Sequence, residues 1–466
     1  MLTYFPNFFS KRAMLCYFIT LLLVSVLFMS RVMPFQFMLF GIVSVFLFFN
    51  YTSKLSMQWR RLSPKLFRKK LFLTALIIRA LYVIFMYNYY INMTGFPYMY
   101  HAADEVRYDY VASLLRDEGW DVFHMYVNAY GLSDRGYFYW LGMIYGLFGN
   151  HVLYGRFVKC FVDSFACLLI YNLTKRNFGE FTGRIVALFY LMMPNMWYYC
   201  GITLKETEMA FLVLLFVERG DYVMHSKKIT VVSLLLPALI CLVLFSFRTA
   251  LASVLVAALV AAIIFSSGKQ LETWKKVLYT SMFGVWMMMT VGVEIIQETQ
   301  ELWTGRTENQ TLGYEFRAER KNGNSFAKYA SASVFAPMIF TIPFSTMVAI
   351  PEQENQMIQH GGNFIKNILS GFTIYALFLL LFSGEWRKHV LPIATMCGYL
   401  LVLVFSNFAH SERFHFPVLG LELMFAAYGL SQVKNKQKRW YTLWLIFICL
   451  ANVAWSYIKL AGRGMA

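Results

Sequence analysis

The sequence predicts an all-α integral membrane protein, a polytopic helical bundle of about 13 transmembrane helices with interfacial helices on its external face. Two observations support this fold class. Of the 466 residues, 59% are hydrophobic and only 14% are charged, a composition that fits the bilayer as solvent. Apolar runs of roughly 20 residues, the length that crosses about 30 Å of hydrocarbon, also recur along the whole chain. A soluble fold is therefore excluded.

The apolar runs define the predicted spans in order along the chain. They lie near residues 14–31, 34–51, 71–92, 156–173, 185–202, 207–222, 229–246, 249–267, 277–296, 364–383, 389–408, 415–431 and 440–459. Two further apolar stretches, 137–149 and 331–350, do not fit as spans. The first is short and the second contains Pro337 and Pro343. We expect both to be helices that lie on or dip into the external interface.

The distribution of basic residues orients the spans, because Lys and Arg resist translocation. The basic segments are 54–70, 175–184, 227–228, 269–276, 387–388 and 434–439. If all are cytoplasmic, then 93–155, 203–206, 297–363 and 409–414 are external, with the amino terminus inside and the carboxy terminus outside. The excess of 42 Lys and Arg over 25 Asp and Glu is then explained by anionic lipid rather than by nucleic acid.

This topology divides the chain into four regions. Residues 1–70 form two N-terminal spans and a basic cytoplasmic loop, and residues 71–296 form a transmembrane core with the external loop 93–155. Residues 297–363 form a second external loop, and residues 364–466 form the C-terminal spans. The seven cysteines lie in or beside apolar runs without a CxxC pattern, so we expect neither disulfides nor zinc.

The loop 93–155 concentrates charge directly after a long apolar stretch. Apolar residues recur at helical spacing over 104–116, which predicts an amphipathic helix on the membrane surface. Asp104 and Glu105 stand at its start. A carboxylate pair at a wet boundary can act as a general base or bind a metal ion, whereas an Asp at a helix start can also be a simple N-cap. The residues alone leave both alternatives open.

The order of these features resembles the GT-C superfamily of glycosyltransferases that use polyprenyl-phosphate sugars. The resemblance is to the branch that holds the protein O-mannosyltransferases and the lipid A aminoarabinose transferases. It covers the acidic motif DEVRY (104–108), the aromatic stretch 137–149, Gly155–Arg156 before the next span, the turn 193–206 and the late helix 410–429. Two extra spans before the loop and the absence of a Lys-Pro-Pro motif after it are departures from that branch.

The resemblance implies a site and its chemistry. It implies that Asp104 is catalytic with Glu105 assisting, that a divalent cation (Mg or Mn), if one is used, binds this pair, and that cations hold the donor phosphate. The candidate phosphate ligands are Arg107, Arg156, Lys205, Arg248 and Arg413, and the candidate substrate contacts are Tyr108, Glu206 and His415. The alternative for each charge is a helix-end residue that reaches to the interface.

The implied reaction moves a sugar from a polyprenyl-phosphate donor to a lipid, glycan or protein acceptor, with no nucleic-acid partner. The expected location is the bacterial inner membrane, with the active site facing the periplasm. An O-antigen or capsule polymerase or ligase is the alternative, and a lipid or oligosaccharide transporter ranks third. Within the spans, Lys159 and Asp163 are predicted to form a neutralised pair one turn apart, and Arg79 has no predicted partner.

Overall fold

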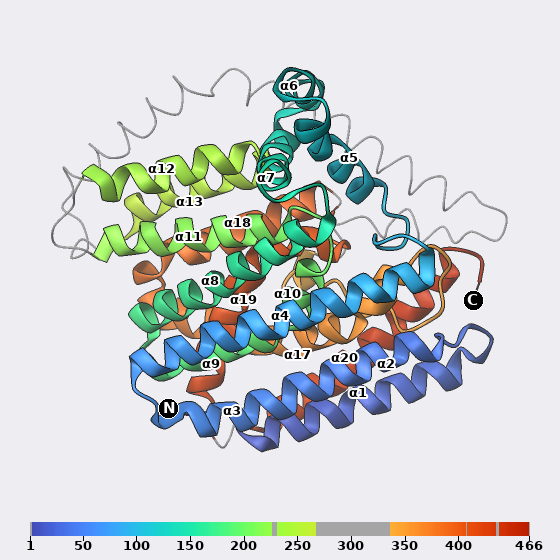
Figure 1. Cartoon of the computed structure of the whole chain (residues 1–466). Coiled ribbons are helices and arrows are strands. Elements are labelled where there is room, and N and C mark those ends of the chain that lie inside the picture. The colour runs from blue at the N-terminus through green and yellow to red at the C-terminus, as the bar shows by residue number, and fades with distance from the viewer. Residues whose placement is uncertain (1, 226–230, 267–335, 407, 435–437, 466) are drawn as a thin grey trace.

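The computed structural model describes residues 2–225, 231–266, 336–406, 408–434 and 438–465. These residues form a helical bundle without a β-strand (Figure 1). The helices are α1 (Asn7–Leu27), α2 (Phe35–Phe46), α3 (Thr52–Gln58), α4 (Pro64–Thr94), α5 (Ala103–Asp117), α6 (Trp120–Asn128), α7 (Leu132–Phe148), α8 (Val152–Phe178), α9 (Glu180–Met192), α10 (Pro194–Cys200), α11 (Glu206–His225), α12 (Val231–Phe245), α13 (Thr249–Phe265), α17 (Glu354–Ser383), α18 (Val390–Phe405), α19 (Glu412–Gln432) and α20 (Lys438–Ala461).

The all-α polytopic class is confirmed. Among the described residues, 7 helices are long and apolar enough to cross a membrane, and they include α1, α4, α8, α17, α19 and α20. The seventh runs from Phe35 to Arg61, because a π-helical turn joins α2 to α3. Shorter apolar helices match three more predicted spans. The predicted span 277–296 lies outside the described residues, so the total of thirteen stays a prediction.

The predicted span 185–202 is not one helix. It divides into α9 and α10 at Met193, whose backbone is extended (φ −70°, ψ 115°) before Pro194. A residue before proline is pushed out of the α-helical region, and proline itself fits the first turn of the next helix. The break therefore follows from the sequence Met-Pro-Asn, and it lies inside the predicted span.

The prediction of a helix over 331–350 is wrong for residues 336–350. The chain there makes one 3-10 turn (Ala336–Met338) and then runs in an irregular, largely buried path. Side chains from two helices satisfy its backbone: Asn367 donates to the carbonyls of Thr341 and Pro343, and Asn452 accepts from the N–H of Ser345 at 2.8 Å. Irregular backbone is tolerated at such depth only where protein surrounds it.

The pairing predicted between Lys159 and Asp163 is also wrong. Asp163 accepts hydrogen bonds from Arg79 and from the Tyr190 hydroxyl, all fully buried between α4, α8 and α9. Lys159 instead donates to backbone carbonyls of the turn before α11, among them that of Ile202 at 2.9 Å. An uncompensated charge in a membrane interior is costly, so Arg79 has the structural role of neutralising Asp163.

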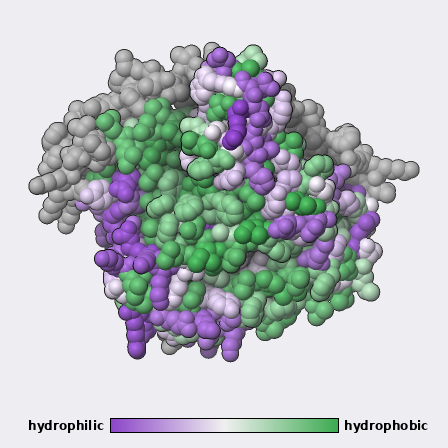
Figure 2. Space-filling model, in the orientation of Figure 1, coloured by the Kyte–Doolittle hydropathy of each residue, from purple (hydrophilic) through white to green (hydrophobic). Residues whose placement is uncertain are grey.

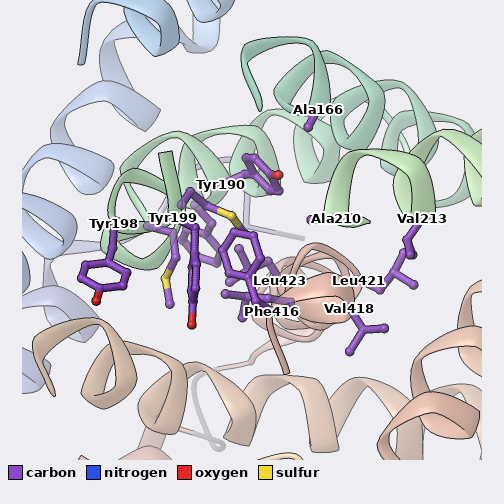
Figure 3. Packing of buried hydrophobic residues seen from close by; sticks show 14 of the residues in the cluster. Ala166, Tyr190, Tyr198, Tyr199, Ala210, Val213, Phe416, Val418, Leu421 and Leu423 are labelled. Atoms are coloured by element: carbon purple, nitrogen blue, oxygen red, sulfur yellow. The ribbon is translucent and has the colours of Figure 1, made fainter. Parts of the chain in front are cut away.

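The core lies where α9, α10, α11 and α19 meet. Figure 3 shows Tyr199 beside Phe416, whose ring centroids are 4.3 Å apart. Aromatic pairs at such distances add stabilisation beyond the area they bury. Elsewhere α2 and α17 approach closely at Gly41 and Gly361, where a Cβ on Gly361 would lie 2.7 Å from the Gly41 Cα. Small residues permit this contact, which packs the N-terminal helices onto the core.

Candidate functional site

The candidate site forms where several segments converge at one end of the bundle. The helices α5, α6 and α7 form a group at the edge of the bundle (Figure 1). Helices were predicted over 104–116 and 137–149, and α5 and α7 correspond to them. Next to this group lie the start of α8, the turn between α10 and α11, the turn between α12 and α13, and the start of α19. Hydrogen bonds and ion pairs described below join these segments.

Glu105 closes the inner side of this site. Its side chain is 0% exposed, and one carboxylate oxygen accepts from Arg156 at 3.4 Å. The other oxygen accepts from the backbone N–H of Met99 at 2.6 Å, and the N–H of Thr203 donates to the first. Arg156 also donates to the carbonyl of Pro97. Glu105 and Arg156 therefore fix the loop 97–105 to α8 and to the turn before α11.

Asp104 faces the opposite way, and 36% of its side chain is exposed. One oxygen accepts from Arg107, one turn along α5, at 3.2 Å. The other accepts from Arg413 at the start of α19. Arg413 donates from its Nε to Glu206, whose side chain is fully buried. A single guanidinium thus bridges two carboxylates that lie far apart in the sequence.

Lys205 extends the network toward α7. Its ammonium group donates to the carboxylate of Asp134 and to the carbonyl of Phe247 at 2.7 Å. Burial lowers the pKa of Lys205 to about 8, although Asp134 works against this shift. Burial would raise the pKa of Asp134, but Lys205, the Tyr108 hydroxyl and Arg107 together hold it below its ordinary value. The pair is therefore charged at neutral pH.

Tyr108 and Arg248 complete the network. The Tyr108 hydroxyl donates to Asp134 at 2.9 Å, and Arg107 lies 3.8 Å from the same carboxylate. Arg248, in the turn between α12 and α13, donates to the Tyr399 hydroxyl at 3.2 Å and lies 3.9 Å from Glu206. Its guanidinium covers the ring of Phe414. We call the set Asp104, Arg107, Asp134, Lys205, Glu206, Arg248 and Arg413 the mouth network.

Six of the ten predicted site residues belong to the mouth network. Tyr108 donates a hydrogen bond to one of its members, Asp134, and Glu105 is the sequence neighbour of another, Asp104. Arg156 lies behind the network as the partner of Glu105, and His415 lies apart. The His415 ring is buried against the Lys366 ammonium at 2.9 Å and the carbonyl of Ala409. Lys366 also lies 3.5 Å from Glu422. His415 thus belongs to a separate buried cluster between α17 and α19.

Asp134 is the site residue that the sequence did not reveal. It stands in the first turn of α7, three residues before the aromatic stretch that was predicted to be interfacial. The sequence offered one sign of its role, which is its position: Asp134 is a carboxylate at the start of the helix that follows the acidic segment. Asp134 pairs with Lys205, which is 71 residues away in sequence. A pairing over that separation cannot be predicted from the sequence alone.

The mouth network has one more cationic side chain than it has carboxylates among the described residues. Its arrangement suits an anionic ligand better than a resident divalent cation. Both oxygens of Asp104 already accept from guanidinium groups, and the described residues hold no group of three His, Cys, Asp or Glu side chains placed to bind a metal ion. These side chains do not fit the predicted cation in this arrangement.

A family model agrees with the predicted superfamily over the last helices of the chain. The model of the Alg9-like mannosyltransferase family, a GT-C family, matches residues 355–461, which run from α17 to the end of α20 and include Arg413. No curated protein matches the chain. The chain is similar in structure to the archaeal oligosaccharyltransferase AglB from Archaeoglobus fulgidus, solved with an inhibitory peptide and a dolichol-phosphate. That similarity has a TM-score of 0.40 at 12% identity, over 86% of this chain and 56% of that chain.

The chain thus spans a little over half the length of that solved structure. The long apolar helices define the class, a polytopic membrane protein, and the match to the Alg9-like mannosyltransferase family covers residues 355–461 of the 466. Over those residues the chain is similar to a GT-C family of glycosyltransferases. The matching family is neither the protein O-mannosyltransferases nor the aminoarabinose transferases, so the branch predicted from the acidic loop stays a prediction.

Proposed function

We propose that this enzyme transfers a sugar from a polyprenyl-phosphate donor to a hydroxyl group of a lipid, glycan or protein acceptor, and that the mouth network is its active site. In this proposal the network faces the periplasm of a bacterial inner membrane. The observation that carries the proposal is the position of Arg413, which engages the exposed carboxylate of Asp104 and the buried carboxylate of Glu206 together.

The cations of the network would bind the donor phosphate. Arg107 and Arg413 are partly exposed, with side-chain exposures of 37% and 24%, so a phosphate can reach them from the membrane boundary. Guanidinium groups bind phosphate in two-pronged geometry. Lys205 and Arg248 lie deeper and add positive charge behind them. This charge would stabilise the phosphate as it leaves with the electron pair of the broken bond.

Binding of the donor would also free the base. In the structure both Asp104 oxygens accept hydrogen bonds from arginines, so neither is available to an acceptor. A phosphate that competes for Arg107 and Arg413 releases the carboxylate. The acceptor oxygen then attacks the anomeric carbon, the bond from that carbon to the phosphate oxygen breaks, and Asp104 takes the acceptor proton. This order would delay proton removal until the donor is bound.

The test is sugar transfer by the purified full chain in detergent, from polyprenyl-phosphate monosaccharides. We expect Asp104→Asn to lower kcat by roughly a hundredfold or more, in the range that general bases contribute. Asp117→Asn is the matched control, because Asp117 is an exposed aspartate at the other end of α5. Equal activity in wild type and Asp104→Asn would move the base elsewhere. Absence of transfer from every monosaccharide donor, with folding intact, would reject the proposed donor class.

A further inference from the structure

A cavity with a basic rim lies at the end of the bundle opposite the mouth network. It occupies about 510 Å³ between the first turns of α4 and the last turns of α8. These two helices run antiparallel and pack together. The opposite ends of the same helices, near Thr94 and Arg156, carry the loop that holds Glu105. Helices of 31 and 27 residues separate the two ends by roughly 40 Å.

The wall of this cavity is strongly basic. Lys65, Arg68 and Lys69 come from α4 and Lys175 comes from α8. Glu180 pairs with Lys175 at 2.8 Å. Among the residues that the structure describes, no carboxylate forms an ion pair with Lys65, Arg68 or Lys69. Three exposed cations therefore surround the opening without a compensating negative charge.

The floor of the cavity is apolar. Phe72, Phe165 and Leu168 line it, and the rings of Phe72 and Phe165 are 4.9 Å apart. Phe165 is 50% exposed. Phe72 lies on α4 and Phe165 on α8, and both helices are long and apolar enough to cross a membrane. Figure 2 shows hydrophilic residues gathered at the end of the bundle where α4 begins, beside a broad hydrophobic area. The cavity thus joins a cationic rim to a surface suited to hydrocarbon.

We propose that this cavity is a binding site for an anionic phospholipid. The lipid phosphate would lie among Lys65, Arg68 and Lys69, and an acyl chain would follow Phe72 and Phe165 toward the middle of the bilayer. Charge complementarity selects this occupant, because basic pockets between transmembrane helices attract anionic headgroups. A free phosphate would satisfy the rim but leave the exposed aromatic floor uncovered. A zwitterionic lipid would cover the floor but bring no net negative charge.

The experiment is native mass spectrometry of the full chain with phosphatidylglycerol or phosphatidylcholine added in equal amounts. We expect wild type to retain phosphatidylglycerol in preference to phosphatidylcholine. The triple variant Lys65→Gln, Arg68→Gln, Lys69→Gln should lose this preference by at least roughly tenfold, given the attraction that each basic residue contributes near a membrane surface. The matched control is Arg387→Gln, Lys388→Gln, Arg439→Gln, which removes equal charge from exposed residues outside the cavity.

Three outcomes would overturn the proposal. Equal preference in wild type and the cavity variant would show that the anionic lipid binds elsewhere. An equal loss in both triple variants would show a general effect of net charge. Displacement of phosphatidylglycerol by inorganic phosphate at matched concentration would show that the site recognises phosphate alone. Because all altered side chains are exposed, thermal unfolding in detergent without lipid should be the same in the three proteins, which separates lipid binding from folding.

Discussion

Two ionic networks begin at neighbouring residues of α5, one closed and one open. Glu105 is completely buried, and its partners are Arg156 and backbone N–H groups. Asp104 is partly exposed, and its partners are Arg107 and Arg413. The closed network holds backbone segments in place, whereas the open one presents charged side chains that a ligand can reach. Adjacent carboxylates therefore differ in what they can do: Glu105 is fixed among buried partners, whereas Asp104 is accessible to a ligand.

This difference shows how an acidic pair should be interpreted in such a loop. The helix turns by about 100° from one residue to the next, so two consecutive carboxylates point to different surroundings. The one that accepts backbone N–H groups in a dry site is fixed, since moving it would leave buried groups without partners. Its neighbour can exchange a guanidinium for a substrate. The predictions below test this division.

The largest expected effect is on stability, in the closed network. Arg156→Ala leaves Glu105 buried without its counter-charge, and loss of one partner of a buried pair costs about 3–5 kcal/mol. We expect the free energy of unfolding, measured by denaturation of the purified protein in detergent, to fall by that amount. Arg387→Ala, which removes an exposed arginine at the other end of the bundle, should change little. Similar values for both variants would contradict the closed network.

The next effect is on catalysis, in the open network. Arg413→Lys keeps the charge but cannot bridge Asp104 and Glu206 with one planar group. We expect kcat/KM for the donor to fall by roughly ten- to a hundredfold, or about 1.4–2.7 kcal/mol. The control is Arg184→Lys, which alters an anchored arginine bonded to Glu180 and to carbonyls near the start of α4. A comparable loss in the control would assign the effect to folding instead.

A third prediction uses the lowered pKa of Lys205. Its ammonium group should lose its proton as the pH rises through about 8, so we expect donor affinity to fall roughly tenfold between pH 7 and pH 9. Stability should move the other way. The unfolded chain keeps this proton up to the ordinary lysine pKa, so between these two pKa values the contribution of Lys205 to stability rises with pH.

The pH dependence of donor KM is the measurement, with Lys205→Gln as the comparison. The variant should show weaker donor binding at pH 7 and a flatter profile above it. A profile that is unchanged in the variant would assign the titration to another group. Stability curves over the same pH range separate the two opposite effects.

The smallest effect is expected at Arg107. It contacts Asp104 and Asp134 from a partly exposed position, and such surface pairs contribute about 0–1 kcal/mol. We expect Arg107→Gln to leave the unfolding free energy within that range of wild type while donor KM rises several-fold. A stability loss as large as that of Arg156→Ala would mean that both networks are structural, and the division between them would fail.

The sequence was sufficient for the helical membrane class, the surface helix α5 and most members of the mouth network. Apolar length and charge position are local properties, and local properties can be read from one chain. The partner of Arg79 was not predictable, since Asp163 is 84 residues away. The path of residues 336–350 was not predictable either. Its backbone is satisfied by Asn367 and Asn452 from later helices, which an apolar pattern does not reveal.

The position of Arg413 has a consequence for how the protein assembles. Chains are synthesised and inserted from the amino terminus, and Asp104, Asp134, Lys205 and Glu206 all enter the membrane long before α19 does. Until that helix arrives, Glu206 lacks the guanidinium that it accepts from, and Asp104 lacks its link to the core. The mouth network therefore assembles only after α19 is inserted, so chains that stop before α19 would lack it.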